Sequence, residues 1–232
     1  MTETAAVYAT KSDYAYTRLR DGILAGEFEP GTVLHQATLA KTIGISTTPL
    51  REAMRRLMTE GLVELDAHRD ARVSALTAEE ARDLLEVRRS LDPLAVSLAA
   101  QRRTKDDIRA MREAAASLHA LPNQPSVVDL VAHRRFHSAI YTASHNDLLI
   151  STLDALWDKA DRYRRLGLQV ERDQPERDLK EREHAELLDA VIRGDSESAA
   201  AVMLQHIATS LGAKAASRLG VDDEPPHLTS LS

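Results

Sequence analysis

The stretch from Gly44 to Leu65, GISTTPLREAMRRLMTEGLVEL, limits what this chain can fold into more than any other part of it. Gly44 can end one helix at a positive φ, and Ser46 or Thr47 can cap the next one by accepting hydrogen bonds from backbone N–H groups. Pro49 then falls in the first helical turn, where its missing donor is tolerated. The sequence therefore predicts a short, capped helix that ends before the second glycine of the stretch.

The two faces of this predicted helix differ in chemistry. Apolar side chains recur at helical spacing and predict a face packed on a core: Leu50, Met54, Leu57 and Met58. The opposite face carries Thr48, Arg51 and Arg55. Hydroxyls at the start of a helix and guanidinium groups along its outer face suit entry into a DNA major groove. The alternative is an ordinary amphipathic helix with a solvated arginine face.

The neighbouring segments favour the DNA-binding interpretation. A short periodic segment at 36–43 precedes the helix across the Gly44 turn. Two short alternating runs follow it, at 62–65 and 71–75, around a polar tip at 66–70. Helix, turn, helix and two-stranded wing is the order of a winged helix-turn-helix.

Four sequence blocks in this region carry a resemblance to a known family. They are ILxGxFxPGTxL (23–34), LAxxIGIS (39–46), TPLREAMRRL (48–57) and EGLV (60–63). With them, residues 14–76 resemble the N-terminal domain of GntR-family transcriptional regulators. Two positions depart from the family pattern: Thr47 stands where the family usually has Arg, and Asp70 where the wing usually has Gly.

The resemblance implies binding to double-stranded operator DNA through the helix and the wing tip. The residues it assigns to DNA contact are Ser46, Thr47, Thr48, Arg51, Arg55, His68 and Arg69. The net charge of −6 is unusual for a DNA-binding protein, and residues 1–76 hold nine Lys and Arg against ten Asp and Glu. Binding must therefore rely on local arginine clusters and helix N-termini rather than on a basic domain.

After the wing, strand-type alternation ends and helical periodicity continues to about residue 218. Aromatic content is only 3%, which is typical of helices packed through aliphatic side chains. We expect about six helices, at 77–102 with a kink or break at Pro93, and at 104–121, 127–143, 146–168, 175–193 and 195–218. The predicted fold is mainly α: a winged helix-turn-helix (1–76), an all-α antiparallel helical bundle (77–218) and a disordered tail (219–232).

The compartment expected from the sequence is the cytoplasm. The chain has no cysteine, which excludes disulfides and thiolate zinc sites. No signal peptide is visible at the start, and the longest apolar run, 94–100, is too short to cross a bilayer. We expect no membrane partner.

Four of the nine histidines fall on apolar stripes of predicted bundle helices: His133, His137, His184 and His206. Two histidines four residues apart on one helix can bind one metal ion, and histidines from facing helices can complete the site. Neutral imidazole suits Zn, Ni, Co or Fe rather than Mg or Ca, and we expect Zn or Ni. The alternative is four separate core histidines, each satisfied by its own neighbours.

The second half of the chain also resembles a known domain, on EVRRxLD (86–92), RFH (135–137), Asn146, EH (183–184), GD (194–195) and QH (205–206). These match the FCD effector domain of the FadR-like GntR subfamily. The resemblance implies that the four histidines are metal ligands, with His133 in place of the usual Asp, and that Arg88 points into the effector cavity. Asp129 could be a further ligand or could form a capping box with Ser126.

The function implied is that of a ligand-responsive transcriptional regulator, a homodimer that binds an inverted repeat in DNA, rather than that of an enzyme. A buried guanidinium beside a metal suits a small carboxylic acid as the effector, although Arg88 could instead be a solvated helix arginine. A metal-ion sensor is the alternative regulator. A di-iron bundle enzyme needs a second Glu-x-x-His besides Glu181–His184, and the chain has none.

Overall fold

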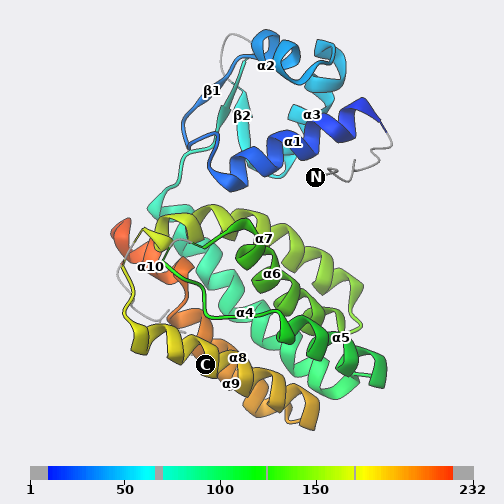
Figure 1. Cartoon of the computed structure of the whole chain (residues 1–232), viewed down its shortest axis with the longest axis vertical. Coiled ribbons are helices and arrows are strands. Elements are labelled where there is room, and N and C mark those ends of the chain that lie inside the picture. Colours follow the sequence, from blue (N-terminus) through cyan, green and yellow to red (C-terminus); the bar gives the residue numbers. More distant parts are fainter. Residues whose placement is uncertain (1–9, 66–69, 124, 170, 222–232) are drawn as a thin grey trace, which may run out of the picture. The chain divides into compact units, whose positions relative to one another are not determined.

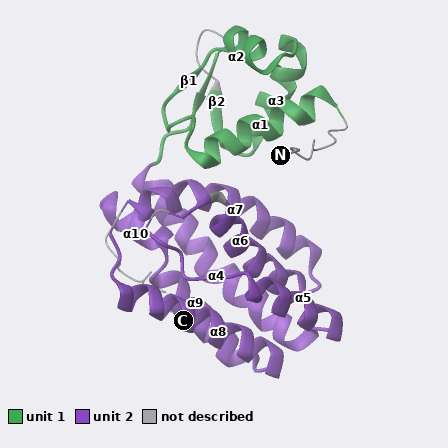
Figure 2. Cartoon of the chain, viewed as in Figure 1, with its two compact units in different colours: residues 1–76 green, residues 77–232 purple. Residues whose placement is uncertain are grey.

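The computed structural model describes residues 10–65, 70–123, 125–169 and 171–221. The chain divides into two compact units, residues 1–76 and 77–232, which Figure 2 shows in different colours. The division falls where the alternating strand pattern of the sequence gives way to helical periodicity. The predicted wing-tip residues His68 and Arg69 lie outside the described residues.

The first unit combines three helices with a small antiparallel sheet (Figure 1). Its elements are α1 (Lys11–Ala25), β1 (Val33–Leu34), α2 (Gln36–Ile43), α3 (Thr47–Thr59), β2 (Val63–Leu65) and β3 (Ala71–Val73). The strand order is β1-β3-β2, and β3 pairs antiparallel with both neighbours. Leu50, Met54 and Leu57 of α3 are buried in the core of this unit. This arrangement confirms the predicted winged helix-turn-helix.

The ends of these helices agree only in part with the sequence interpretation. Gly44 ends α2 at φ 73, as predicted. The Thr10 side chain caps α1 by accepting the Asp13 N–H at 3.0 Å. Ser46 holds the cap position of α3, yet its side chain makes no capping hydrogen bond. The hydroxyl therefore remains available for another partner.

The second unit is built from seven helices in its described part: α4 (Ala78–Arg102), α5 (Lys105–Ala116), α6 (Val127–Thr142), α7 (Asp147–Leu168), α8 (Gln174–Arg193), α9 (Ser196–Ala208) and α10 (Leu211–Arg218). The long helix α4 contacts α6, α7, α8, α9 and α10 and forms the centre of the bundle (Figure 1). The predicted helical bundle is thereby confirmed. None of the described helices combines the length and apolarity needed to cross a membrane.

Three boundaries differ from the prediction. The last segment forms two helices instead of one, because the Ser210 side chain accepts the Ala213 N–H and starts α10 anew. Helix α5 ends at Ala116 instead of reaching residue 121. Of the kink or break expected at Pro93, a break does not occur, since α4 continues through the proline. A proline removes one hydrogen bond, and the buried residues that follow, such as Val96, hold the helix in register.

The start of α4 is tied to α7 by a tyrosine that sequence reasoning did not find. The Thr77 side chain accepts the Glu80 N–H at 3.1 Å, which is half of a capping box. In a complete capping box the Glu80 side chain would accept the Thr77 N–H. Here the Tyr163 hydroxyl lies between the two groups, since it accepts the Thr77 N–H at 3.2 Å and donates to Glu80 at 2.7 Å. The first turn of α4 is thus fixed to the body of the bundle.

Helix α10 is seated closely against α7. A Cβ atom at Gly167 would lie 2.2 Å from the backbone oxygen of Leu211, so only glycine permits this approach. The close packing holds α10 beside the cavity that contains the predicted histidines.

Candidate functional site

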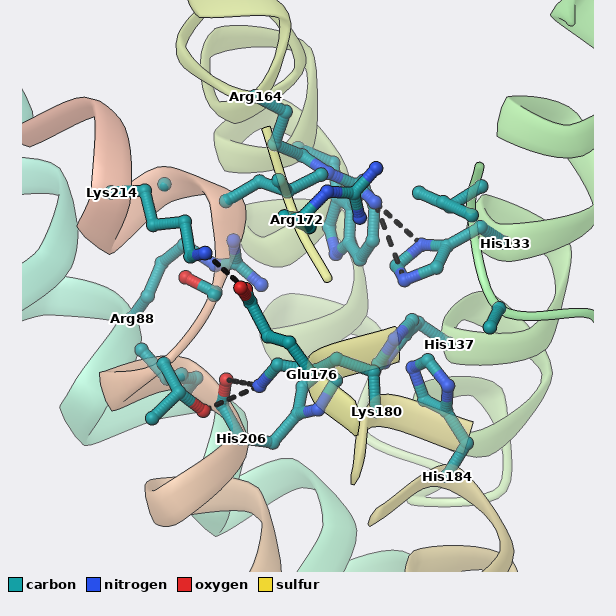
Figure 3. A pocket seen from close by; sticks show the side chains of 18 residues that line it. Arg88, His133, His137, Arg164, Arg172, Glu176, Lys180, His184, His206 and Lys214 are labelled. Atoms are coloured by element: carbon teal, nitrogen blue, oxygen red, sulfur yellow. Dashed lines mark hydrogen bonds and ion pairs between the residues drawn. The ribbon is translucent and has the colours of Figure 1, made fainter. Parts of the chain in front are cut away.

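The four predicted histidines meet in the core of the second unit. His133 and His137 come from α6, His184 from α8 and His206 from α9. Each offers one ring nitrogen such that all four atoms lie within 4.8 Å of one another, and all four residues are buried (Figure 3). Separate histidines scattered through a core would not converge in this way. The cluster has the size and donor type of a metal site.

His206 is held in the tautomer that a metal ligand needs. Its Nδ1 lies 2.8 Å from the Glu183 carboxylate, which also accepts the Lys180 ammonium at 2.7 Å. Burial alone would raise the pKa of Glu183, but the hydrogen bonds with His206 and Lys180 hold it below its usual value. An ionised Glu183 keeps the proton on Nδ1 and leaves Nε2 as a free acceptor. A carboxylate behind a histidine is a common support for metal ligands.

His137 and His184 have ring nitrogens that lack partners. Both nitrogens of His137 and the Nε2 of His184 are buried without a hydrogen bond to any described residue. Burial lowers the pKa of each ring well below its ordinary value, and nearby positive charge lowers it further. The rings are therefore neutral, with lone pairs that a buried cation would satisfy. This donor set fits Zn or Ni and does not fit Mg or Ca.

His133 differs from the other three. The Nη2 of Arg164 lies 2.7 Å from its Nδ1 and 3.3 Å from its Nε2, and the shorter contact is a donation to Nδ1, which leaves the ring proton on Nε2. In this tautomer His133 has no free lone pair, so it can ligate an ion only after leaving Arg164. Asp129 is not in the cluster, because its carboxylate completes a capping box with Ser126. His137, His184 and His206 can therefore bind an ion as they stand. His133 can do so only after its hydrogen bond with Arg164 breaks.

The cluster lies at one side of a cavity of about 50 Å³. Five cationic side chains line this cavity: Arg88, Arg164, Arg172, Lys180 and Lys214 (Figure 3). Of these, sequence reasoning identified only Arg88. Lys180 could have been found, since it precedes His184 by one helical turn. The others come from positions that only the tertiary fold brings to the histidines.

Arg88 is buried and is not a solvated helix arginine. Its Nε and Nη2 donate to Asp92 at 3.1 and 2.6 Å, and its guanidinium carbon lies 5.2 Å from the centre of the Trp157 ring. Burial acts to lower the pKa of Arg88, but the Asp92 charge outweighs it and raises the pKa. Arg164 stacks on the same ring at 4.7 Å. Arg88 and Arg164 therefore both line the cavity and both contact the Trp157 ring.

The predicted DNA-contact residues of α3 are all exposed: Ser46, Thr47, Thr48, Arg51 and Arg55. The Nε of Arg51 donates to Gln36 of α2 at 3.1 Å, which fixes the base of this long side chain. Arg56, also on α3, contacts α1, where it donates to Asp13 at 2.8 Å and lies over the Tyr16 ring. Arg56 therefore belongs to the contact between α3 and α1.

Asp70 has a structural role that the sequence did not indicate. Its carboxylate lies 2.8 Å from Nδ1 of His35 and accepts the Gln36 N–H at 3.1 Å. His35 provides no side-chain cap for α2, so Asp70 caps that helix from the base of the wing. Because Gln36 also receives Arg51, the wing and both helices of the motif are joined at one point. The contact spans 34 positions, and no local sequence pattern reveals it.

Comparison with known proteins agrees with both units. The family model described as "Bacterial regulatory proteins, gntR family" matches residues 11–73, and the model described as "FCD domain" matches residues 83–209. The chain is 29% identical to the HTH-type transcriptional repressor GlaR of Escherichia coli (strain K12), over 84% of this chain and 92% of GlaR. It is 30% identical to an HTH-type regulator in an unstable DNA locus of Streptomyces ambofaciens, over 83% of this chain and 80% of the relative.

A solved structure shows the same fold. The E. coli McbR/YncC chain superposes with a TM-score of 0.72 at 22% sequence identity, covering 87% of this chain and 97% of that chain. At this level of identity the likeness concerns the fold and not the ligand.

The support that Glu183 gives to His206 yields a first prediction. Replacing Glu183 with Gln removes the charge that fixes the Nδ1 proton, so we expect the affinity for Zn²⁺ to fall about 10- to 100-fold. Competition with a fluorescent chelator measures this on the full chain. Glu186→Gln, an exposed change on the same helix, is the control. Equal Zn²⁺ affinity in wild type and Glu183→Gln would contradict the assignment of His206.

Proposed function

Because this chain belongs to the GntR family of bacterial regulatory proteins and carries an FCD domain, it is a DNA-binding transcriptional regulator, and we propose that it is a repressor released from its operator by a small carboxylic acid. The observation that carries the proposal is the cavity in which a histidine cluster and five cations converge. The relative GlaR is named a repressor, which supports repression rather than activation.

We propose that a divalent ion, Zn or Ni, is bound by the histidine cluster. His137, His184 and His206 would hold it through their free nitrogens, and His133 would join them on leaving Arg164. When bound, such an ion supplies a positive centre that attracts a carboxylate oxygen. With histidine in place of the family's usual Asp, the site is one unit more positive, which strengthens its attraction for anions.

Arg88 is the proposed clamp for the effector carboxylate. Asp92 and Trp157 hold its guanidinium in place at the cavity wall, so little conformational freedom is lost when an acid binds. Helix α4, which carries Arg88, begins at Ala78, two residues after the first unit ends. We propose that α4 transmits effector binding to the DNA-binding unit through a change in its angle or mobility.

A metal-ion sensor remains the second candidate, and the size of the cavity favours it. A volume of about 50 Å³ holds an ion and a few water molecules without rearrangement, whereas an organic acid needs more room. The two candidates differ in what releases the operator: metal alone in a sensor, and acid added to metal-loaded protein in an acid-responsive repressor.

The proposed operator is a short inverted repeat bound by a homodimer. One recognition helix reads only a few base pairs, and two-fold symmetry doubles the contact. In each subunit, α3 would present Ser46, Thr47, Thr48, Arg51 and Arg55 to base edges and phosphates, with His68 and Arg69 at the wing.

Arg51 gives the test of the DNA-reading face. Arg51→Ala should weaken binding to an operator selected from random duplexes by about tenfold or more, because it removes a charged contact in the groove. A gel shift measures the affinity, and size-exclusion chromatography checks that the oligomeric state is retained. Arg112→Ala, an exposed arginine of α5, is the control and should bind as wild type. Unchanged operator binding by Arg51→Ala would overturn the DNA-contact assignment.

Effector release is tested with a panel of organic acids. Acids are first screened for thermal stabilisation of metal-loaded protein, and operator affinity is then measured with each acid that stabilises it. An acid that releases DNA must bind the DNA-bound protein more weakly by the same factor. Arg88→Ala should weaken acid binding at least tenfold, whereas Arg82→Ala, exposed on the same helix, should not.

Two results would contradict this proposal. One is an acid that binds tightly, leaves operator affinity unchanged and binds Arg88→Ala equally well. The other is release of the operator by metal in the absence of any acid, which would identify the metal-ion sensor instead.

A further inference from the structure

The cations that line the cavity are balanced by carboxylates, with one exception. Four ion pairs are present: Arg88–Asp92, Arg164–Asp161, Lys180–Glu183 and Lys214–Glu176. Arg172 is the fifth cation, and no described residue offers it a carboxylate within contact distance. Its Nη2 donates to the Pro122 backbone oxygen, while its buried Nε has no partner in the described part of the chain.

Among the four carboxylates, only that of Glu176 itself lines the cavity. The other three carboxylates do not line the cavity and contact their cations from outside it: Asp92, Asp161 and Glu183. Figure 3 shows the Glu176 side chain reaching from α8 toward Lys214, with Arg172 and Arg88 labelled nearby. The Glu176 carboxylate therefore occupies the position at which an anion that enters the cavity would contact the cationic side chains.

The charge of Glu176 acts on more than Lys214. Burial lowers the pKa of Arg172, and Glu176 partly opposes this effect. Burial likewise lowers the pKa of Lys180, which Glu183 and then Glu176 oppose. Glu176 thus contacts Lys214, and its charge also favours the charged forms of Arg172 and Lys180. An external carboxylate at the same place would contact Lys214 and have the same effect on the other two cations.

The size of the cavity requires that something leave before an acid enters. A water molecule needs roughly 10–15 Å³ by this measure, and sites for organic ligands typically offer about 300 Å³ or more. The cavity measures about 50 Å³. Asp92 is fully buried, whereas the Glu176 side chain is 30% exposed and lies in the first turn of its helix. Glu176 can turn to solvent without leaving a buried charge behind.

We propose that Glu176 is an internal competitor of the effector. In the absence of acid its carboxylate occupies the anion position beside Lys214, and the carboxylate of the acid displaces it. This inference rests on the proposed carboxylic-acid function of the same cavity. The exchange replaces one ion pair of Lys214 with another, so Lys214 is not left without a counter-ion.

Two consequences follow from this competition. The apparent affinity for the acid is lowered by the fraction of molecules in which Glu176 holds the site. The Glu176–Lys214 pair also ties α8 to α10, whose Leu211, Gly212 and Lys214 line the cavity. Displacement of Glu176 therefore releases one attachment of α10, and the cavity can enlarge on that side.

The test compares Glu176→Gln and Glu176→Asp with the wild type. The probe is succinate, with uncharged succinamide as its control, added to Zn-loaded full-length protein. Binding is followed by the fluorescence of Trp157, the single tryptophan of the chain, which lines the cavity. Both variants should bind succinate about fivefold or more tightly than the wild type, because neither side chain can hold Lys214 with a carboxylate at the native position.

The aspartate variant separates displacement from a general effect of charge. It retains the negative charge but is one methylene shorter, so it cannot reach Lys214 in the same way. Glu181→Gln removes an equal charge from an exposed position of α8 and should leave the affinity unchanged. In the absence of ligand, amide hydrogen exchange over 211–218 should rise in Glu176→Gln and Glu176→Asp, and circular dichroism checks that both remain folded.

Each unfavourable result has a distinct meaning. Tighter binding by Glu176→Gln alone would show that only charge matters and would overturn the competitor. Equal binding by wild type and both variants would overturn it as well, while leaving the carboxylate site intact. If no variant binds succinate saturably, the carboxylate site of the proposed function fails, and the competitor fails with it.

Discussion

The second unit is organised around four uncharged imidazoles buried together. Burying polar nitrogens without partners is costly, and here both nitrogens of His137 and one of His184 lack any partner among the described residues. One neighbouring side chain is arranged as a metal site would require, since Glu183 fixes the tautomer of His206, whereas the Arg164 contact with His133 must break before that ring can bind an ion. A bound cation would convert this cost into a stabilising interaction, which accounts for histidines in a core that could otherwise be aliphatic.

Charge balance around the cluster determines what else can bind. Five cations beside a metal would repel one another strongly in a buried setting, so each needs a counter-ion. Three counter-ions are carboxylates that lie outside the cavity, and the fourth is the carboxylate of Glu176, which can move. A cavity with both fixed and exchangeable counter-ions can accept an external anion without burying an unpaired charge. The same arrangement favours carboxylates over neutral ligands.

The periodic features of both units could be read from the sequence, and the long-range contacts could not. Helical spacing alone placed His133, His137, His184 and His206 on buried stripes, because side-chain direction follows from position along a helix. The break before Ser210 was missed because an apolar pattern continues across it. Asp70 and Lys214 act on residues more than thirty positions away, and the packing that joins them depends on the whole fold.

Elemental analysis tests most directly whether the histidine cluster holds a Zn or Ni ion. Wild-type protein purified without chelator is compared with His137→Ala, with circular dichroism to confirm that the variant is folded. About one Zn or Ni ion per wild-type chain and a large loss in the variant are expected, since His137 is buried without a hydrogen-bond partner among the described residues and its ring lone pair is free to bind the ion. Equal, near-zero metal in both proteins would contradict metal binding and leave four structural histidines.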